Sequence, residues 1–150
     1  MAGFDLGTVD IEWRVSSGGQ KAHAVSVKGM ARFQNRMELF GKVFREKVKN
    51  ALVAEFKEIL KNAVAITPKD TGALRLSGRV LTPSGGGRTV VNVDIVFGGV
   101  SRLGKFVDYA EAVHDNPKGF SFKNGEEKFL EKTWARMRPG IEDRIAARVK

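Results

Sequence analysis

The stretch MARFQNRMELFGKVFREKVKNALVAEFKEILKNAVAI, residues 30–66, decides the fold. Its apolar side chains recur every three or four positions, which is the period of one face of an amphipathic helix. These positions are Met30, Phe33, Met37, Phe40, Phe44, Val48, Leu52, Phe56, Ile59 and Ala63. The pattern predicts a long helix over 29–66 that ends at Thr67 and Pro68, because the residue before a proline is pushed out of the helical region.

The length of this helix has a consequence for packing. At about 1.5 Å per residue it would be roughly 50 Å long, more than a compact domain of this size covers with its own core. The helix therefore either bends or packs on another subunit. Gly41 is the expected bend, since glycine costs about 1 kcal/mol relative to alanine inside a helix.

Alternating residues on both sides of the helix predict strands. Val9, Ile11, Trp13 and Val15 alternate with charged residues and predict a strand in an N-terminal arm, 1–28, which also holds a weaker extended stretch around Val25 and Val27. In 73–98, one run begins with Leu74, Leu76 and Val80, and the other contains Val91, Val93, Ile95 and Phe97. The glycine-rich segment 83–87 joins the two runs, so 73–98 is predicted to be an antiparallel hairpin.

The last third of the chain is predicted to be mostly helical. We expect a loop over 98–104, a short helix over 105–115, a loop over 116–125 and C-terminal helices over 126–150, interrupted at Pro139. The sequence thus predicts one α+β domain, 1–150. In it, an antiparallel sheet made of the N-terminal strand and the central hairpin packs against the long helix and the C-terminal helices.

Composition excludes several classes of function. The chain has no cysteine and two histidines, so disulfides, thiolate metal sites and usual zinc sites are not expected. His114 beside Asp115, with Asp108 and Glu111 nearby, is the one cluster that acid/base chemistry could use, but a helix-end histidine explains it more simply. We therefore predict no catalytic residue, no cofactor, no metal and no enzymatic activity. No apolar run is long enough to span a bilayer, so a soluble protein made in the cytoplasm, without a membrane partner, is expected.

The charge of the chain favours polyanionic neighbours. Lys and Arg number 26 against 17 Asp and Glu, which gives a formal charge of +9. Non-specific nucleic-acid binding is therefore the alternative function. No helix-turn-helix, zinc-finger or RNA-recognition pattern is present, which argues against sequence-specific binding.

Large aromatic side chains are candidates for subunit contacts. A stripe at helical spacing is most often core, and the stripe on the long helix is interpreted as core plus subunit interface. Two aromatics in the 116–125 loop are expected to dock, because a purely solvated loop does not need them. The candidate interface residues are Phe33, Phe40, Trp13, Phe120, Phe122 and Trp134, of which the two tryptophans are equally explained as core.

Three ordered motifs carry a resemblance to a known family. They are P-x-D-T-G-x-L-x-x-S from Pro68 to Ser77, Y-A-x-x-V-H from Tyr109 to His114, and G-x-x-K-F-L-E from Gly125 to Glu131. In this order over residues 25–150 they resemble a small tail-component family of tailed double-stranded DNA bacteriophages, whose relatives are described as neck, tail-completion or minor capsid proteins. The structural motif residues are Pro68, Asp70, Thr71, Gly72, Leu74, Tyr109, Ala110, His114, Lys128, Phe129 and Leu130.

The resemblance implies a non-enzymatic virion protein of the neck that joins tail to head along the DNA exit path. It implies a homo-oligomeric ring, hexameric or dodecameric, in contact with head-completion or adaptor proteins and with tail-terminator or tail-tube proteins. Basic side chains would face genomic DNA in the lumen or acidic surfaces of adjoining rings. The first motif also reads as a structural corner on physical grounds: Pro68 stops the helix, Asp70 or Thr71 bonds nearby amides, and Gly72 accepts a positive φ.

Overall fold

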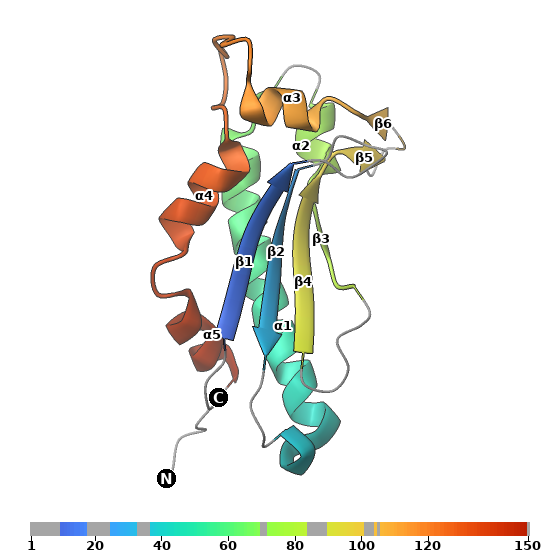
Figure 1. Ribbon diagram of the computed structural model, residues 1–150, viewed down its shortest axis with the longest axis vertical. Coiled ribbons are helices and arrows are strands. Elements are labelled where there is room, and N and C mark those ends of the chain that lie inside the picture. Colours follow the sequence, from blue (N-terminus) through green and yellow to red (C-terminus); the bar gives the residue numbers. More distant parts are fainter. Residues whose placement is uncertain are drawn as a thin grey trace.

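An antiparallel sheet with helices against one face forms the frame of the protein (Figure 1). The computed structural model describes residues 10–17, 25–32, 37–69, 72–83, 90–100, 104 and 106–149. The main sheet holds, in spatial order, β1 (Asp10–Ser17), β2 (Val25–Arg32), β4 (Val90–Phe97) and β3 (Arg79–Leu81). A small second sheet pairs β5 (Gly99–Val100) with β6 (Phe106–Val107). The helices are α1 (Met37–Ile66), α2 (Ala73–Ser77), α3 (Ala110–Asp115), α4 (Phe129–Met137) and α5 (Ile141–Val149). The predicted α+β class is confirmed.

The core lies between the sheet and α1. Along β4, buried residues alternate with half-buried ones, so one face of this strand is covered and the other is partly open. At the centre of β2, Gly29 leaves room for the ring of Phe56, and a Cβ at position 29 would overlap that ring. The helix therefore approaches the sheet closely. Among the described side chains of α1, the buried ones are Val48, Ala51, Leu52, Glu55, Phe56, Ile59 and Ala63.

The predicted start of the long helix is wrong. Met30 lies in β2, whose residues 25–32 pair with β1 on one side and with β4 on the other. Two full ladders of backbone hydrogen bonds outweigh the helical spacing of Met30, and α1 begins at Met37. The apolar face of α1 from Val48 to Ala63 is buried in the chain's own core, so this part of the helix does not pack on another subunit. The first turns of α1 extend beyond the end of the sheet (Figure 1).

The predicted hairpin is only partly present. Residues 73–77 form α2, so Leu74 is buried while Leu76 is 42% exposed, as helical and not strand spacing requires. The strand before the turn is reduced to Arg79–Leu81, paired with residues 94–96 of β4. The glycine-rich tip, 85–87, lies outside the described residues.

Three further boundaries differ from the prediction. The weak extended stretch around Val25 and Val27 is the central strand β2, so β1 and β2 replace the single N-terminal strand. The predicted helix over 105–115 begins only at Ala110, because Phe106 and Val107 pair with β5. That same pairing brings Gly99 and Val100 of the predicted loop into a strand. The loop 116–125 and the helical C-terminus are confirmed.

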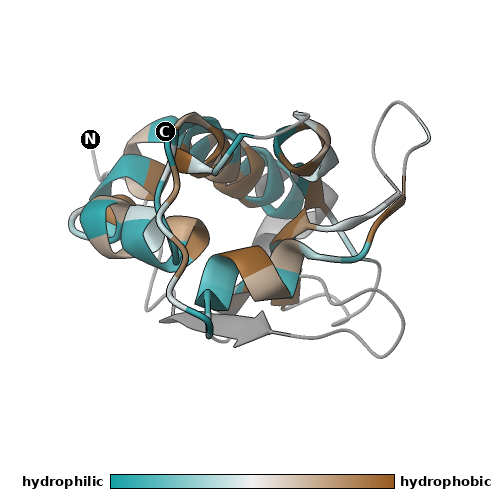
Figure 2. Ribbon diagram, turned by 90° about the horizontal axis from the view of Figure 1, so that it is seen from above, coloured by the Kyte–Doolittle hydropathy of each residue, from teal (hydrophilic) through white to brown (hydrophobic). Residues whose placement is uncertain are grey.

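The two C-terminal helices pack on α1. Pro139 lies between α4 and α5, as expected. Glu55 of α1 is 2% exposed, and its carboxylate accepts hydrogen bonds from Arg144 Nε and Arg148 Nε of α5, each at 2.9 Å. Figure 2 shows hydrophilic residues along the outer sides of the helices and hydrophobic ones toward the middle. A charged clamp and an apolar interface thus hold α5 to α1.

Candidate functional site

The carboxyl end of α1 is closed by its own side chains and by Arg75. Thr67 Oγ1 donates to Ala63 O at 2.7 Å, and the Thr67 residue is fully buried. Arg75 Nε donates to Thr67 O at 2.8 Å, which satisfies a carbonyl just past the last turn. A guanidinium at this end also complements the helix dipole. The first part of the motif therefore ends α1.

In the first motif, Gly72 is the residue that directly precedes α2. Asp70 and Thr71 lie outside the described residues. Gly72 has φ +85°, the left-handed conformation that was predicted, and it precedes α2. Leu74 is buried, but it lies in a helix and does not start a strand as we expected.

Ser77, the last residue of the first motif, connects α2 to Gly98, the residue that follows β4. Its hydroxyl donates to Leu74 O at 2.6 Å and accepts from the backbone N–H of Gly98 at 2.9 Å. Ser77 is fully buried, so without its hydroxyl the Gly98 N–H would have no bond there. Sequence reasoning placed this serine in the motif but did not select it as a site residue, and its fixed place at the end of the motif is the signal that could have identified it.

The third motif touches the first through Gly125. The backbone N–H of Glu126 donates to Ile66 O at 2.7 Å, and that of Lys69 donates to Asn124 O at 3.3 Å. Gly125 has φ +102°, and a Cβ there would lie 2.5 Å from Pro68 N and 2.7 Å from Ile66 O. Since real Cβ atoms do not approach backbone atoms so closely, only glycine fits.

The second motif joins the third through His114. The backbone N–H of Lys128, which precedes α4 with φ +50°, donates to His114 O at 2.6 Å. The His114 ring packs edge-on against Phe129, with 5.0 Å between ring centres, and Phe129 packs in the same way on Phe97. Ala110, Phe129 and Leu130 are fully buried. The structure thus brings the three sequence motifs into one place, which we call the motif corner.

Asn116 organises the loop between the second and third motifs. It ends α3 in the left-handed conformation, with φ 45°. Its side-chain oxygen accepts from the Phe120 N–H at 2.9 Å, while its Nδ2 donates to Phe120 O at 2.8 Å and to Glu127 Oε2 at 3.1 Å. These bonds hold Phe120 in place, although its side chain is 64% exposed.

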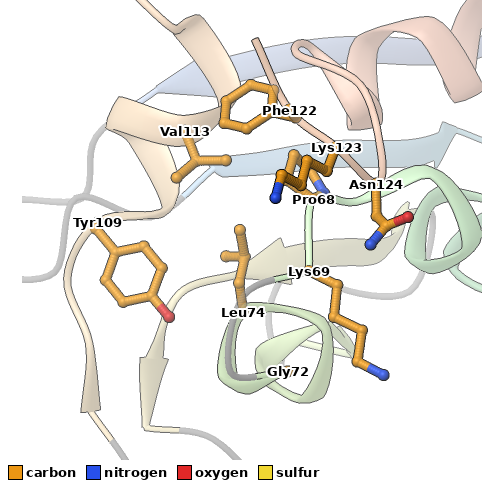
Figure 3. Close-up of a pocket in the computed structure, with 9 residues that line it drawn as sticks. All are labelled: Pro68, Lys69, Gly72, Leu74, Tyr109, Val113, Phe122, Lys123 and Asn124. Carbon is orange, nitrogen blue, oxygen red and sulfur yellow. The ribbon is translucent and has the colours of Figure 1, made fainter. Parts of the chain in front are cut away.

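A pocket of about 370 Å³ opens at the motif corner (Figure 3). Leu74, Val113 and Phe122 supply apolar surface, and Tyr109 stands at one side. Lys69 and Lys123 add positive charge, and Pro68, Gly72 and Asn124 complete the lining. Among the described residues, those that line the pocket include no carboxylate. The described lining is therefore suited to an apolar or anionic group.

His114 is the centre of the cluster that was considered for acid/base chemistry. His114 is 2% exposed, and its Nδ1 lies 2.9 Å from Asp115 Oδ1. Its Nε2 is buried, without a hydrogen-bond partner in the described part of the chain. Across the described ranges, no group of three or more His, Asp or Glu side chains is placed to hold a metal ion. The arrangement of His114 is that of a core side chain.

The half-buried face of β4 carries a carboxylate with a shifted pKa. Asp94 of β4 lies opposite Lys28 of β2 in the strand register. Partial burial raises the pKa of Asp94 above its ordinary value, and the charge of Lys28 opposes this effect. The ionised form of Asp94 is therefore less favourable in the folded chain than in water.

The candidate interface residues fall into three groups. Phe120 is exposed, and Phe122, half-buried, lines the pocket. Trp134 is 8% exposed and belongs to the core, which removes it from the interface candidates. Phe33 and the side chains of Trp13 and Phe40 lie outside the described part of the structure.

The described helices include none that is long and apolar enough to cross a membrane. No protein-family model, no curated protein and no solved structure matches this chain.

Proposed function

We propose that the protein is a structural, non-enzymatic subunit of the neck of a tailed bacteriophage, where copies form a ring between head and tail. One observation carries the proposal: the three motifs that resemble the tail-component family meet at the motif corner. Gly125 and Ser77 each make a contact there that explains why their motif holds that residue type, and Lys128 contributes its backbone N–H. A corner held together by such contacts supports a structural role for the three motifs.

The motif corner also supplies an attachment surface. Tyr109, which is 38% exposed, lines the pocket together with two lysines, and Phe120, which is 64% exposed, lies two residues before the lining residue Phe122 in the sequence. Exposed aromatics beside a pocket are typical anchors of protein interfaces. We assign this surface to a head-side or tail-side neighbour in the neck.

The position of the first turns of α1 is the second observation that supports the proposal. The first turns of the helix project past the sheet, where Met37, Phe40 and Phe44 recur at helical spacing in the sequence. A ring neighbour would cover this end of α1. The charge of +9 suits a lumen that surrounds DNA or a surface that meets acidic neighbours.

The location in the virion is tested on purified particles of a tailed phage that encodes this chain. Quantitative mass spectrometry should find the chain in intact virions at a fixed ratio to the portal protein. Its absence from virions would refute the proposal.

The attachment surface is tested by complementation with variants. Phe120→Ser should leave folding unchanged but reduce the yield of tailed particles at least about tenfold, because a central aromatic anchor dominates interface energy. The control is Phe106→Ser, which removes another exposed phenylalanine, 58% exposed and located in β6, outside the 116–125 loop. Equal yields from Phe120→Ser and wild type would refute this use of the corner.

Non-specific nucleic-acid binding, which rests on the net charge, remains the second candidate. It predicts duplex DNA binding that weakens steeply with salt and no dependence on Phe120.

A further inference from the structure

A second concave surface lies between α1, α2 and β3, and it shares no lining residue with the pocket at the motif corner. Its volume is about 510 Å³, and we call it the basic groove. Its apolar surface comes from Leu60 and Val64 of α1, Leu76 of α2 and Val80 of β3. Its cations are Lys57, Lys61, Arg75 and Arg79, and Gly78 completes the lining.

The groove carries positive charge that the described chain does not neutralise. Lys57 and Lys61 are exposed and lie one turn apart on α1. The described residues that line the groove include no aspartate or glutamate. Glu58 lies beside them on α1 but is not part of the lining. The groove is thus complementary to an anionic partner.

Backbone carbonyls hold both arginines in place without cancelling their charge. Arg75 Nε donates to Thr67 O, and Arg79 Nη1 donates to Ser77 O at 2.9 Å and to Gly98 O at 2.6 Å. Carbonyl groups orient a guanidinium but carry no net charge, so its attraction for a carboxylate remains. The two arginines are therefore preorganised, which lowers the entropy cost of binding.

Apolar surface and a free strand edge favour a protein partner over DNA. Leu76 is 42% exposed, and a phosphodiester backbone offers nothing apolar to cover it. In the described sheet β3 pairs only with β4, so its outer edge presents unpaired backbone groups (Figure 1). An extended peptide can bind to such an edge through its main chain.

We propose that the basic groove binds an extended acidic segment of a partner protein, in which Asp or Glu alternates with Leu or Val. The carboxylates pair with Lys57, Lys61 and the two arginines, and the apolar side chains cover Leu76 and Leu60. The segment lies along the free edge of β3. This inference does not depend on a role in the phage neck.

The test uses the full chain and a labelled synthetic peptide of about eight residues, the length of a typical strand, with alternating Glu and Leu. Fluorescence anisotropy measures its dissociation constant at low and at physiological salt. The same peptide with Gln in place of Glu, polyglutamate and a short DNA duplex are the comparison ligands. We expect the Glu-Leu peptide to bind more tightly than all three.

Two double variants test how much the charges of the groove lysines contribute to peptide binding. Lys57→Glu with Lys61→Glu should weaken peptide binding at least about tenfold, because two attractive charges become repulsive. The control, Lys118→Glu with Arg138→Glu, changes the net charge equally at exposed positions outside the groove and should have less than about a threefold effect. Both pairs lie at exposed positions, so folding is preserved.

Leu76→Gln distinguishes a peptide from nucleic acid. It should weaken peptide binding about fivefold and leave any DNA binding unchanged, since only the peptide covers apolar surface. Tighter binding of the duplex, sensitive to Lys57 and Lys61 but not to Leu76, would overturn the proposal in favour of a nucleic-acid site. Failure of all ligands to bind at low salt, or equal effects of the two charge-reversal pairs, would also overturn it.

Discussion

Replacing Gly125 with alanine is the sharpest test of the motif corner. The added methyl group would lie 2.5 Å from Pro68 N, 2.6 Å from Pro68 Cα and 2.7 Å from Ile66 O, all of them backbone atoms. A flexible side chain could rotate away from the methyl group, but the backbone here cannot. The loop around Gly125 must therefore move away from the end of α1.

The expected loss of stability has two sources. Alanine at φ +102° is strained by about 1–2 kcal/mol. The displaced loop also loses the hydrogen bonds from Glu126 N to Ile66 O and from Lys69 N to Asn124 O, each worth about 1 kcal/mol. We expect Gly125→Ala to lower the free energy of unfolding by about 3–4 kcal/mol, and the melting temperature by roughly 10 °C.

Urea unfolding followed by circular dichroism measures this loss. Gly119→Ala is the matched control, because Gly119 has φ +68° and a Cβ there meets nothing within 4 Å. Gly119→Ala should lower the free energy of unfolding only by the strain of alanine at a positive φ, about 1 kcal/mol. If the two variants are equally stable, the close contact between the first and third motifs does not exist and the reasoning fails.

Four further predictions concern the core, the clamp and the sheet. Ser77→Ala should cost about 1–3 kcal/mol in urea unfolding, because the Gly98 N–H loses its buried acceptor, whereas the exposed Ser121→Ala should cost less than about 0.5 kcal/mol. Glu55→Ala should lower stability by about 2 kcal/mol by leaving Arg144 and Arg148 without their shared carboxylate, and near-wild-type unfolding would contradict the clamp. Arg144→Ala should destabilise more than Arg148→Ala, since Arg144 also donates to Met137 O and Pro139 O; the reverse order would be evidence against this. Asp94→Asn should stabilise the fold at neutral pH by less than about 1 kcal/mol, and the gain should disappear below the ordinary aspartate pKa of 3.8, which unfolding curves at several pH values would show.

The sign of the Asp94 effect follows from its pKa. Because the pKa is raised in the folded state, the folded chain holds this proton more tightly than the unfolded chain does. As the pH rises through the interval between the two pKa values, ionisation therefore destabilises the fold. Asparagine cannot ionise, so a variant that is less stable than wild type at neutral pH and equal to it in acid would contradict the assignment.

Periodicity predicted the elements whose buried faces repeat over several turns. The second half of α1, the strand β4 and the helices α4 and α5 were identified in this way. Residues 73–77 were assigned to a strand because Leu74 and Leu76 alternate, and five residues are too few to separate alternation from a single helical turn. Met30 was assigned to the helix because its spacing fitted, whereas the ladders on both sides of β2 decide its conformation.

The site was predictable in its parts but not in its arrangement. The motif order identified Pro68, Gly72, Tyr109 and His114, and the stop at Pro68 and the positive φ of Gly72 followed from residue type alone. The contact of Gly125 with Pro68 joins segments that are distant in the sequence, and no local pattern indicates it. The basic groove was missed for the same reason, since its cations come from α1, α2 and β3.

The mass of the assembled protein tests the central claim most directly. Light scattering on the purified chain, alone and mixed with the portal-side and tail-side neck proteins of the same phage, measures whether it forms a ring. The account predicts a closed multiple of the 16.5 kDa subunit, formed alone or on mixing with a neighbour. A mass of 16.5 kDa in every mixture would contradict it.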